Sequence, residues 1–445
     1  MSSRINIDVV VPHYPFMPFF LDQTRELAEK FMAGHPEYVI RVSGEDWLSV
    51  PQVVHDAVRR GSVPTIAQYF YTSAQEARDA RKPDGSPLFT SVERAIAGRT
   101  EILGEPVVLG DVAPAARQYY TYDGEVAAMP PLTSTTLLYA NTTMLERAGI
   151  TEVPQTWAGI EAACRAVTAL PDGPGHAITW PNHGWLFQQS VAQQGALLAD
   201  HDNGRSGRAE TVHLDSDAML AYVGWWRRLH RTGLYRFHAS RVNTEVDWDA
   251  NFRAFADQQV AFTLTTSVEA ARMAQAGRDG GFEVQACRMP YNEQVPYAGN
   301  VIGGDALWLA AGLSPEAQDG ALAFMQYLNT PRTAADRHRA TGFIPVTGGT
   351  IDLLDQEGWF HRNPHFRTAL DQLAANDGSP AARGALLGDF AGIQDVITSA
   401  MHDVLVTDVD PRARFAQANA QAQELLDHYN AAARGERPRG PIRVG

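Results

Sequence analysis

The chain of 445 residues has little lysine and little cysteine, and both shortages exclude kinds of site. Lys30 and Lys82 are the only lysines and neither follows a glycine, so the Gly-Lys-Ser/Thr core of a nucleotide-hydrolysing phosphate loop does not occur. Cys164 and Cys287 are the only cysteines, too few and too far apart for a zinc site or a disulfide framework. We expect both to be small buried hydrophobic residues, with one bridge between them left open as the alternative.

Long apolar runs are also missing. No stretch of eighteen apolar residues occurs, so the sequence predicts no transmembrane helix. Residues 1–7 lead directly into a strand, without the apolar region of a signal peptide or a lipoprotein cysteine, so an exported form would be one whose signal has been removed. The net charge of -14 opposes binding to nucleic acid or to an anionic lipid surface, and we expect no nucleic-acid partner.

The length suits two lobes of about 200 residues, each large enough for its own hydrophobic core. Apolar and β-branched residues predict strands over 5–12, 38–42 and 64–70, with helices between them, the second over 50–60. This βαβαβ order predicts an α/β fold with a parallel sheet covered by helices. Ligands of such sheets bind at the carboxyl ends of the strands.

The later part of the chain continues with helices and strands. Further elements are expected as helices over 154–170, 214–232, 268–276 and 315–329 and a strand over 259–267. Thr156 and Ser314 are the predicted N-caps of the first and the last of these helices. The Trp225-Trp226 pair on the second is expected in the core. Residues 201–209 are expected to form an exposed turn, and 435–445 a flexible tail.

The segment 299–308 is the most informative part of the chain. It places the pair Gly303-Gly304 on an apolar strand, with Asp305 beside it. Glycines tolerate the backbone changes of a hinge, so this strand is typical of a protein that closes on a ligand. Asp305 is interpreted as a ligand acceptor, with a buried acid satisfied by backbone donors as the alternative. No His-Glu-x-x-His, Gly-x-Ser-x-Gly or dinucleotide fingerprint occurs, so we expect a binding protein and not an enzyme.

Short motifs follow one another in a characteristic order. They are GSVPTI at 61–66, LLYAN at 137–141, PQTW at 154–157, GW at 184–185, IGGDALW at 302–308 and HRATGFIP at 338–345. With these motifs the chain resembles, over nearly its whole length, the extracellular solute-binding proteins of ABC importers. This is the maltose-binding-protein-like superfamily, and the resemblance is greatest to its glycerol-3-phosphate-binding branch.

The resemblance implies a two-lobed fold of the periplasmic-binding-protein type, class II, with a hinge between lobes that clasp the ligand. The expected lobes are 1–133 with 267–305 and 134–266 with 306–434, followed by the tail. The resemblance also implies a membrane permease as partner, a monomer without a cofactor, and an extracytoplasmic location, periplasmic or attached to the cell surface.

The binding site of the family carries over with some positions kept and others changed. The glycerol-phosphate branch has an arginine for the ligand phosphate where this chain has Leu386, and a tyrosine and a glutamate where it has Phe343 and Tyr71. The two aromatic residues of the family are kept as Trp47 and Trp185, and its serines are kept in kind. The predicted ligand-binding residues are His13, Tyr14, Trp47, Tyr71, Thr133, Ser134, Trp185, Thr266, Ser267, Gly304, Asp305, Phe343 and Asp389. No catalytic or metal-binding residue is predicted.

These changes bear on the ligand. A phosphate dianion needs charged bidentate donors, and Leu386 offers none. Aromatic and acidic residues instead suit a neutral or amino-bearing carbohydrate or a polyol, because C–H faces pack on rings and carboxylates accept hydroxyl protons. One alternative is a glycerol-3-phosphate or glycerophosphodiester receptor that uses another donor, such as Arg383. The other is a glycoside hydrolase-like enzyme with Asp305 and Asp389 as its two carboxylates.

Like Asp305, four other predicted site residues have purely structural alternatives. Trp185 has the alternative of a core tryptophan, and Asp389 that of an N-cap for the helix that follows it. His13, at the end of the first strand, has the alternative of a structural hydrogen bond. Trp47, on a polar loop, has the alternative of a core position.

Overall fold

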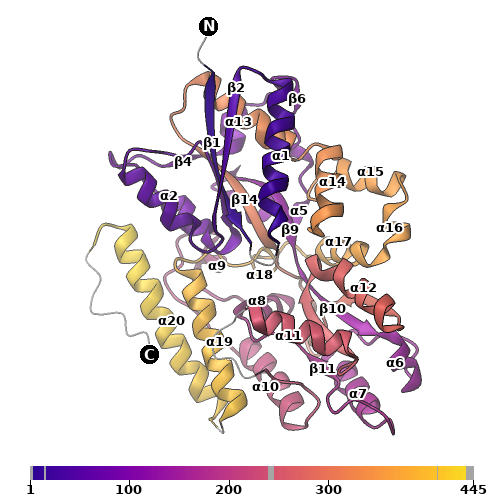
Figure 1. Cartoon of the computed structure of the whole chain (residues 1–445). Helices are drawn as coiled ribbons and strands as arrows, with labels where there is room; N and C mark the ends of the chain where they lie inside the picture. The colour runs from indigo at the N-terminus through magenta and orange to yellow at the C-terminus, as the bar shows by residue number, and fades with distance from the viewer. Residues whose placement is uncertain (1–3, 15–16, 239–244, 408, 437–445) are drawn as a thin grey trace. The chain divides into compact units, whose positions relative to one another are not determined.

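The computed structural model describes residues 4–14, 17–238, 245–407 and 409–436. The chain divides into two compact units (Figure 1). Unit 1 consists of Met1–Thr133 and Ile302–His361, and unit 2 of Ser134–Val301 and Arg362–Gly445. The chain therefore passes from one unit to the other three times, after residues 133, 301 and 361.

Unit 1 is built on a six-stranded sheet of order β2-β1-β3-β14-β4, with β9 also paired to β14. Its strands are β1 (Ile5–His13), β2 (Tyr38–Asp46), β3 (Ile66–Phe70), β4 (Phe89–Thr90), β9 (Met129–Ser134) and β14 (Gly303–Ala310). The strands β1, β2 and β3 are parallel, whereas β14 runs antiparallel to β3. The helices α1 (Phe19–Gly34) and α2 (Val50–Arg59) connect the parallel strands (Figure 1), so the predicted βαβαβ unit and the α/β class are confirmed.

The rest of unit 1 consists of short elements and four helices that follow β14. The short elements are η1 (Tyr71–Ser73), α3 (Ala74–Asp79), α4 (Val92–Ile96), β5 (Glu101–Ile102), β6 (Glu105–Pro106), η2 (Leu109–Asp111), α5 (Pro114–Tyr119), β7 (Thr121–Tyr122) and β8 (Glu125–Val126). The later helices are α13 (Pro315–Tyr327), α14 (Pro331–Thr341), α15 (Gly348–Gln356) and α16 (Trp359–Arg362). As predicted, Ser314 caps α13, since its side chain accepts a hydrogen bond from the Ala317 backbone N–H.

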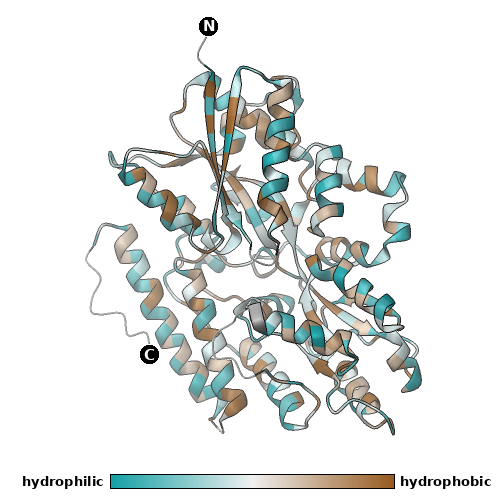
Figure 2. Cartoon of the chain, viewed as in Figure 1, coloured by the Kyte–Doolittle hydropathy of each residue, from teal (hydrophilic) through white to brown (hydrophobic). Residues whose placement is uncertain are grey.

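The core of unit 1 lies between the sheet and the helices that cover it. Alternate residues of β1, namely Ile7, Val9 and Val11, are fully buried, and the hydrophobic residues of this strand stand out in Figure 2. They pack in one cluster with Phe31 of α1 and Phe324 of α13. Burying each such aliphatic side chain stabilises the fold by about 1.5–3 kcal/mol. The cluster therefore holds β1 and its neighbouring strands in place, and with them the ends of these strands.

Unit 2 contains a four-stranded sheet of order β11-β12-β10-β13. Its strands are β10 (Thr136–Asn141), β11 (Ile178–Thr179), β12 (Phe262–Thr266) and β13 (Val284–Arg288). Its helices before β13 are α6 (Thr142–Arg147), α7 (Trp157–Thr168), α8 (Gly184–Gln193), α9 (Asp200–Gly204), α10 (Asp217–Arg231), α11 (Glu245–Ala256), η3 (Ser267–Glu269) and α12 (Ala270–Gly280). The remaining helices are η4 (Pro364–Phe366), α17 (Arg367–Ala374), α18 (Pro380–Arg383), α19 (Phe390–Val406) and α20 (Pro411–Ala433).

The core of unit 2 is rich in tryptophan. The rings of Trp157 and Trp180 both stack on the ring of Trp225, with centroid distances of 5.2 Å and 5.5 Å. Trp226 is also fully buried, so the prediction that the tryptophan pair of α10 lies in the core is confirmed. Thr156 caps α7 as predicted, accepting from the Gly159 backbone N–H.

The expected lobe boundaries need correction. Residues 267–301 belong to unit 2 and not to the first lobe, because β13 pairs with β10 of that unit. Residues 306–361 belong to unit 1 and not to the second lobe, because β14 pairs with β3 and α13 packs on β1. Strand partners, which a linear sequence does not specify, decide both assignments.

Smaller predictions had mixed outcomes. The segment 201–209, expected as an exposed turn, has left-handed backbone at His201, Asp202 and Asn203, and the first two of these are exposed. Asn203 is buried, and its Oδ1 accepts from the backbone N–H groups of Leu198 and Ala199. Cys164 and Cys287 are free and buried, as expected, which excludes the bridge between them. Most of the predicted flexible tail, from residue 437 onward, lies outside the described residues.

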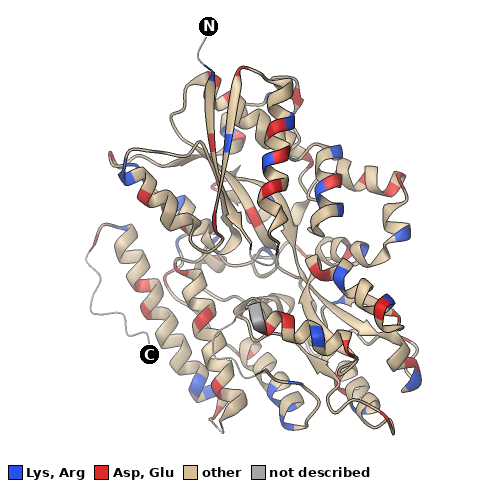
Figure 3. Cartoon of the chain, viewed as in Figure 1, with Lys and Arg blue, Asp and Glu red and all other residues tan. Residues whose placement is uncertain are grey.

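The distribution of charge and the length of the helices complete the description of the two units. Figure 3 shows acidic and basic residues interspersed along the helices of both units. Among the described residues, every helix is too short or too polar to cross a bilayer.

Candidate functional site

The predicted site residues of unit 1 gather at one edge of its sheet. His13 is the last residue of β1 and is exposed, and Tyr14 follows it. Trp47 follows β2, and Tyr71 begins η1 directly after β3. Because β1, β2 and β3 are parallel, their carboxyl ends meet at the same edge (Figure 1), which is the favoured ligand position in α/β sheets.

Asp305 connects this edge to β14. It faces Phe70 of β3 in the strand register, and its side chain is fully buried. The phenol of Tyr14 donates a hydrogen bond to Asp305 Oδ2, and the Gln68 amide donates to the same oxygen at 3.0 Å. The acid is thus held by side-chain donors and not by the backbone donors of the alternative interpretation. Asp305 Oδ1 has no hydrogen-bond partner among the described residues.

The protonation of this cluster follows from burial. Burial raises the pKa of Asp305 to about 6, although the hydrogen bonds from Tyr14 and Gln68 and the charge of Arg337 act to lower it. Burial and the neighbouring carboxylate raise the pKa of Tyr14 well above its ordinary value, so its phenol keeps the proton that it donates. Burial lowers the pKa of Arg337 to about 10, which still leaves this side chain charged at neutral pH.

Aromatic rings surround the same edge. Trp47 is half-buried, and its ring lies edge-on to Phe70, with centroids 4.8 Å apart, and 6.2 Å from the ring of Tyr14. Phe70 in turn contacts Tyr71, whose carbonyl accepts a hydrogen bond of 3.0 Å from Tyr119. The half-buried state of Trp47 means that part of its ring is accessible, as a stacking surface requires.

Gly304 and Thr133 hold β9 against β14. Gly304 has φ +97, and a Cβ atom there would lie 2.6 Å from the Leu132 carbonyl oxygen. Thr133 Oγ1 donates to the Gly303 carbonyl oxygen at 2.9 Å, and the Thr133 carbonyl accepts from Ile344 N–H at 2.8 Å. The glycine is therefore required for close approach of two strands inside unit 1.

Phe343, which lies on the turn after α14, is almost fully buried. Its ring centroid lies 6.5 Å from that of Phe20 in α1. Phe343, which stands where the family has a tyrosine, therefore packs against α1.

The hydroxyl residues of unit 2 bond to nearby backbone. Thr266 Oγ1 accepts from Val268 N–H at 3.3 Å, and Ser267 Oγ accepts from Thr135 N–H at 3.2 Å. Ser267 also donates its backbone N–H to the Thr135 carbonyl. Ser134, the residue before Thr135, is buried. These bonds tie the start of β10 to the end of β12, as Ser and Thr side chains often do in turns.

Trp185 occupies the first turn of α8 in unit 2. It is only 7% exposed, yet its indole N–H has no partner among the described residues. His183 precedes it as the N-cap, its Nδ1 accepting from the Trp185 backbone N–H at 3.1 Å. Burial lowers the pKa of His183 to about 4, so this imidazole is neutral and able to accept. The ring of Trp248 lies edge-on at 5.9 Å from His183.

Asp389 is the N-cap of α19, as the structural alternative proposed. Its Oδ1 accepts from Gly392 N–H at 3.3 Å, and burial raises the pKa of this half-buried acid. Leu386, at the position of the missing arginine, is buried. Arg383 is exposed and donates from Nε to the Gly378 carbonyl oxygen at 3.0 Å.

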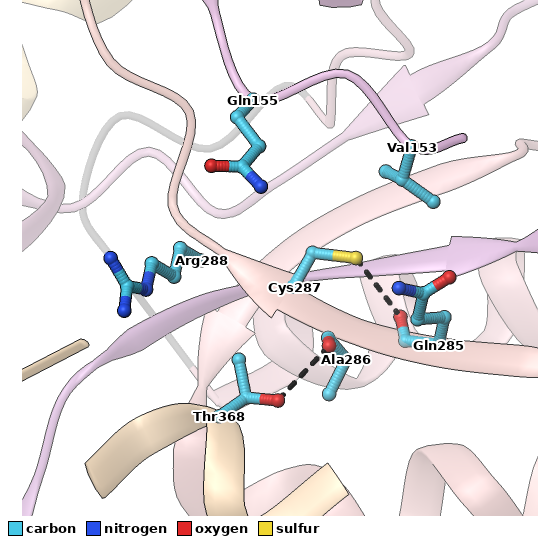
Figure 4. Close-up of a pocket in the computed structure, with 7 residues that line it drawn as sticks. All are labelled: Val153, Gln155, Gln285, Ala286, Cys287, Arg288 and Thr368. Atoms are coloured by element: carbon cyan, nitrogen blue, oxygen red, sulfur yellow. Dashed lines mark hydrogen bonds between the residues drawn. The ribbon is translucent and has the colours of Figure 1, made fainter. Parts of the chain in front are cut away.

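Two surface pockets lie in unit 2, away from every predicted site residue. The first, of about 430 Å³, is lined by residues of β13, including Cys287 and Arg288, together with Gln155 and Thr368 (Figure 4). The second, of about 500 Å³, lies beside Arg147 and Arg236. The described residues contain no group of three or more His, Cys, Asp or Glu side chains placed to hold a metal ion.

Gln68, Arg337 and Trp248 surround the predicted site residues but were not predicted from the sequence. Gln68 is a single polar residue on an otherwise apolar strand, and that isolation was a usable signal. Arg337 lies in the polar helix α14 among other charged residues, so its burial leaves no trace in the sequence pattern. Trp248 lies on a segment without a strong periodic pattern.

The chain is similar to several known proteins. A sequence model of the family described as "Bacterial extracellular solute-binding protein" matches residues 26–368. The sn-glycerol-3-phosphate-binding periplasmic protein UgpB of Yersinia pestis is 24% identical over 416 residues, which covers 91% of this chain and 89% of the relative. The corresponding protein of Salmonella typhimurium is 23% identical over 418 residues, covering 92% and 90%.

Solved structures show the same architecture. The sugar-binding protein MalE of Xanthomonas citri has a TM-score of 0.73 at 17% identity, and the match covers 97% of this chain and 100% of that one. UgpB of Mycobacterium tuberculosis in complex with glycerophosphocholine has a TM-score of 0.72 at 21% identity, covering 96% and 99%.

Proposed function

Since the chain belongs to the family of bacterial extracellular solute-binding proteins, we propose that it delivers a neutral carbohydrate or polyol to the permease of an ABC importer. Two-lobed proteins of the MalE type share its fold. The proposal includes an extracytoplasmic location and a monomeric state. It keeps as ligand contacts the residues predicted from the sequence, apart from Phe343, which packs on Phe20, and Asp389, which caps α19.

The observation that carries the proposal is the partly accessible ring of Trp47 at the carboxyl ends of three parallel strands. Tyr14 lies against it and is anchored on Asp305. Rings of this kind pack on the C–H faces of sugars, while His13, exposed at the end of β1, offers a hydrogen-bonding group to hydroxyls. A buried Leu386 where the glycerol-phosphate branch has its arginine supports a ligand without a phosphate dianion.

A second candidate is a glycerol-3-phosphate or glycerophosphodiester ligand. It is supported by relatives named as glycerol-3-phosphate-binding proteins and by a structural neighbour in complex with glycerophosphocholine. Arg383 is the donor that the sequence offered for this case, and its Nε is engaged by the Gly378 carbonyl.

Catalysis is not part of the proposal. The two carboxylates considered for glycoside hydrolysis each have a partner within their own unit, Asp305 with Tyr14 and Asp389 with the backbone of α19. Turnover of an aryl glycoside by the purified protein would contradict a purely binding role.

A thermal-shift screen of the purified chain tests the ligand class. We expect maltose or ribitol to raise the melting temperature and sn-glycerol 3-phosphate and glycerophosphocholine to leave it unchanged, because only a solute that binds the folded state stabilises it. Shifts caused by the two phosphate compounds, with none from a wider panel of sugars and polyols, would favour the second candidate.

A further inference from the structure

Arg337 is an unusual residue in unit 1 because two nitrogen atoms of its buried guanidinium lack a hydrogen-bond partner within the described part of the chain. The side chain is 2% exposed, and its Nε and Nη1 atoms have no hydrogen-bond partner among the described residues. Its Cζ atom lies 5.9 Å from the ring centroid of Phe20, at the outer limit of a cation–π contact. Burying a guanidinium in this way is costly unless a nearby opposite charge compensates it.

Asp305 is the acid of the same buried cluster, because Arg337 lies over the Phe20 ring, Phe20 is edge-on to Tyr14, and Tyr14 donates to Asp305. The groups that act on its carboxylate are Tyr14 and Gln68, through hydrogen bonds, and Arg337, through its charge. The neighbouring strands β3, β4 and β9 carry no charged residue. On the Trp47 side, the titratable groups are His13, which precedes Tyr14, and Asp46, its partner in the β1–β2 register. The acidic residues of α13 interact elsewhere, since Asp319 pairs with Arg99 and Glu316 is on the first turn beside Tyr38. No ion pair joins Arg337 to Asp305 among the described residues, so each acts on the other through its charge within the buried cluster.

The carboxylate in turn orients Tyr14. The phenol of Tyr14 donates to Asp305 Oδ2, and its ring lies 5.3 Å from Phe20, edge-on. Trp47 lies next to Tyr14, with 6.2 Å between ring centroids, and is the partly accessible member of the group. A continuous series of contacts therefore leads from the buried charges to the ring that the proposed function places against a ligand.

We propose that Arg337 is a positioning residue of the candidate site: it keeps the Asp305 carboxylate charged, and through Tyr14 this carboxylate fixes the ring of Trp47. The relevance of Trp47 to a ligand rests on the proposed function. The link from Arg337 to Trp47 does not, because it exists in the protein without a ligand.

The test follows the Trp47 ring by fluorine NMR of the full chain labelled with 5-fluorotryptophan. The Trp47 signal is assigned as the one that Trp47→Phe removes. In the unsubstituted protein we expect its chemical shift to change with an inflection near pH 6, where Asp305 titrates. Arg337→Met is expected to move this inflection upward by on the order of one pH unit, because loss of the positive charge favours the protonated acid.

Three further variants make the result decisive. Arg337→Lys, which retains the charge, is expected to keep the inflection close to that of the unsubstituted protein. Arg337→Gln is a second uncharged variant and is expected to behave like Arg337→Met, including where the methionine variant does not fold. Asp305→Asn is expected to abolish the inflection.

The proposal is overturned by an inflection that is the same in the unsubstituted protein and in the uncharged variants, or by one that survives Asp305→Asn when His13 is also replaced by glutamine. A Trp47 signal that never responds to pH overturns it as well. Titration of the same samples with maltose and with glycerophosphocholine is read separately. Absence of maltose binding with an intact Arg337 effect counts against the proposed ligand class and not against the positioning role.

Discussion

Asp305 is the side chain on which most contacts of unit 1 converge. It accepts from Tyr14 and Gln68, it faces the charge of Arg337, and it is fully buried on the central part of β14. Burial disfavours its charged form, so the folded state binds a proton more tightly than the unfolded chain does. This difference makes the residue a source of pH-dependent stability.

Stability measured against pH tests this environment. The pKa of Asp305 is raised to about 6, above its usual value, so the stability gained by protonating it is fully present at low pH and is lost as the pH rises through 6. Relative to Asp305→Asn, the unsubstituted protein should therefore lose on the order of 2 kcal/mol of unfolding free energy between pH 4.5 and pH 7.5. Urea unfolding of both proteins across this range measures the difference, and a difference that does not vary with pH would refute the assignment.

Trp185 provides a second test at a single residue. Because it is 7% exposed with an indole N–H that lacks a partner among the described residues, its ring is expected to support α8 while the N–H is available to a ligand oxygen. Trp185→Phe should leave the melting temperature nearly unchanged and weaken maltose binding about tenfold, the usual cost of one hydrogen bond.

The matched control for this variant is Trp226→Phe. Trp226 also has an indole N–H without a partner among the described residues, but it packs in the aromatic core with Trp180 and Phe187. The Trp226→Phe substitution should not affect maltose affinity. Equal losses of affinity in the two variants would indicate an indirect effect of packing and not a contact by Trp185.

Among the secondary-structure elements, the pair β9 and β14 is sensitive to substitution at Gly304. Gly304→Ala would place a Cβ atom 2.6 Å from the Leu132 carbonyl oxygen and 2.9 Å from Thr133 Cα, at a backbone φ of +97. Both the clash and the strain oppose the substitution, so we expect a loss of about 2–4 kcal/mol of unfolding free energy. Gly34→Ala at the end of α1 is the control, since no atom lies within 4 Å of its added Cβ, and it should change stability by less than about 1 kcal/mol.

Denaturant unfolding of the two alanine variants distinguishes this role from a hinge. A Gly304→Ala protein as stable as Gly34→Ala would show that β9 does not approach β14 closely, and that the glycine serves conformational freedom instead.

The same strands show which parts of the fold the sequence predicts. Local patterns suffice for β1, for the Ser314 cap and for the Trp225-Trp226 core pair, because each depends on residues close together in the chain. Strand partners depend on residues far apart, so the assignment of β13 and of β14 to their units could not be obtained from periodicity.

The candidate site was predictable to a similar degree. The position of Tyr14 and Trp47 at strand ends follows from the βαβ order, and the isolated Asp305 on an apolar strand was identified by its polarity. The capping role of Asp389 was one of two readings of the sequence, and its hydrogen bond to Gly392 supports the structural one. The burial of Arg337 depends on the packing of α14 and has no local signal.

For the whole molecule, the family match and the similarity to solved structures indicate the same architecture. The family match spans residues 26–368, and two-lobed binding proteins of known structure share the architecture over nearly the full chain. Each unit holds part of the predicted ligand set, Tyr14, Trp47 and Asp305 in unit 1 and Trp185 with the hydroxyl residues in unit 2. The proposal of a ligand without a phosphate rests on the buried Leu386, where the resemblance to the glycerol-phosphate branch implies an arginine, and on the aromatic residues at the strand ends.

Calorimetric titration of the purified protein with maltose and with sn-glycerol 3-phosphate, side by side at pH 7.5, tests this central claim most directly. If a sugar is the ligand, maltose should bind with a dissociation constant on the order of micromolar, near -8 kcal/mol, and sn-glycerol 3-phosphate should give no heat of binding. Micromolar binding of sn-glycerol 3-phosphate without any binding of maltose would contradict the account.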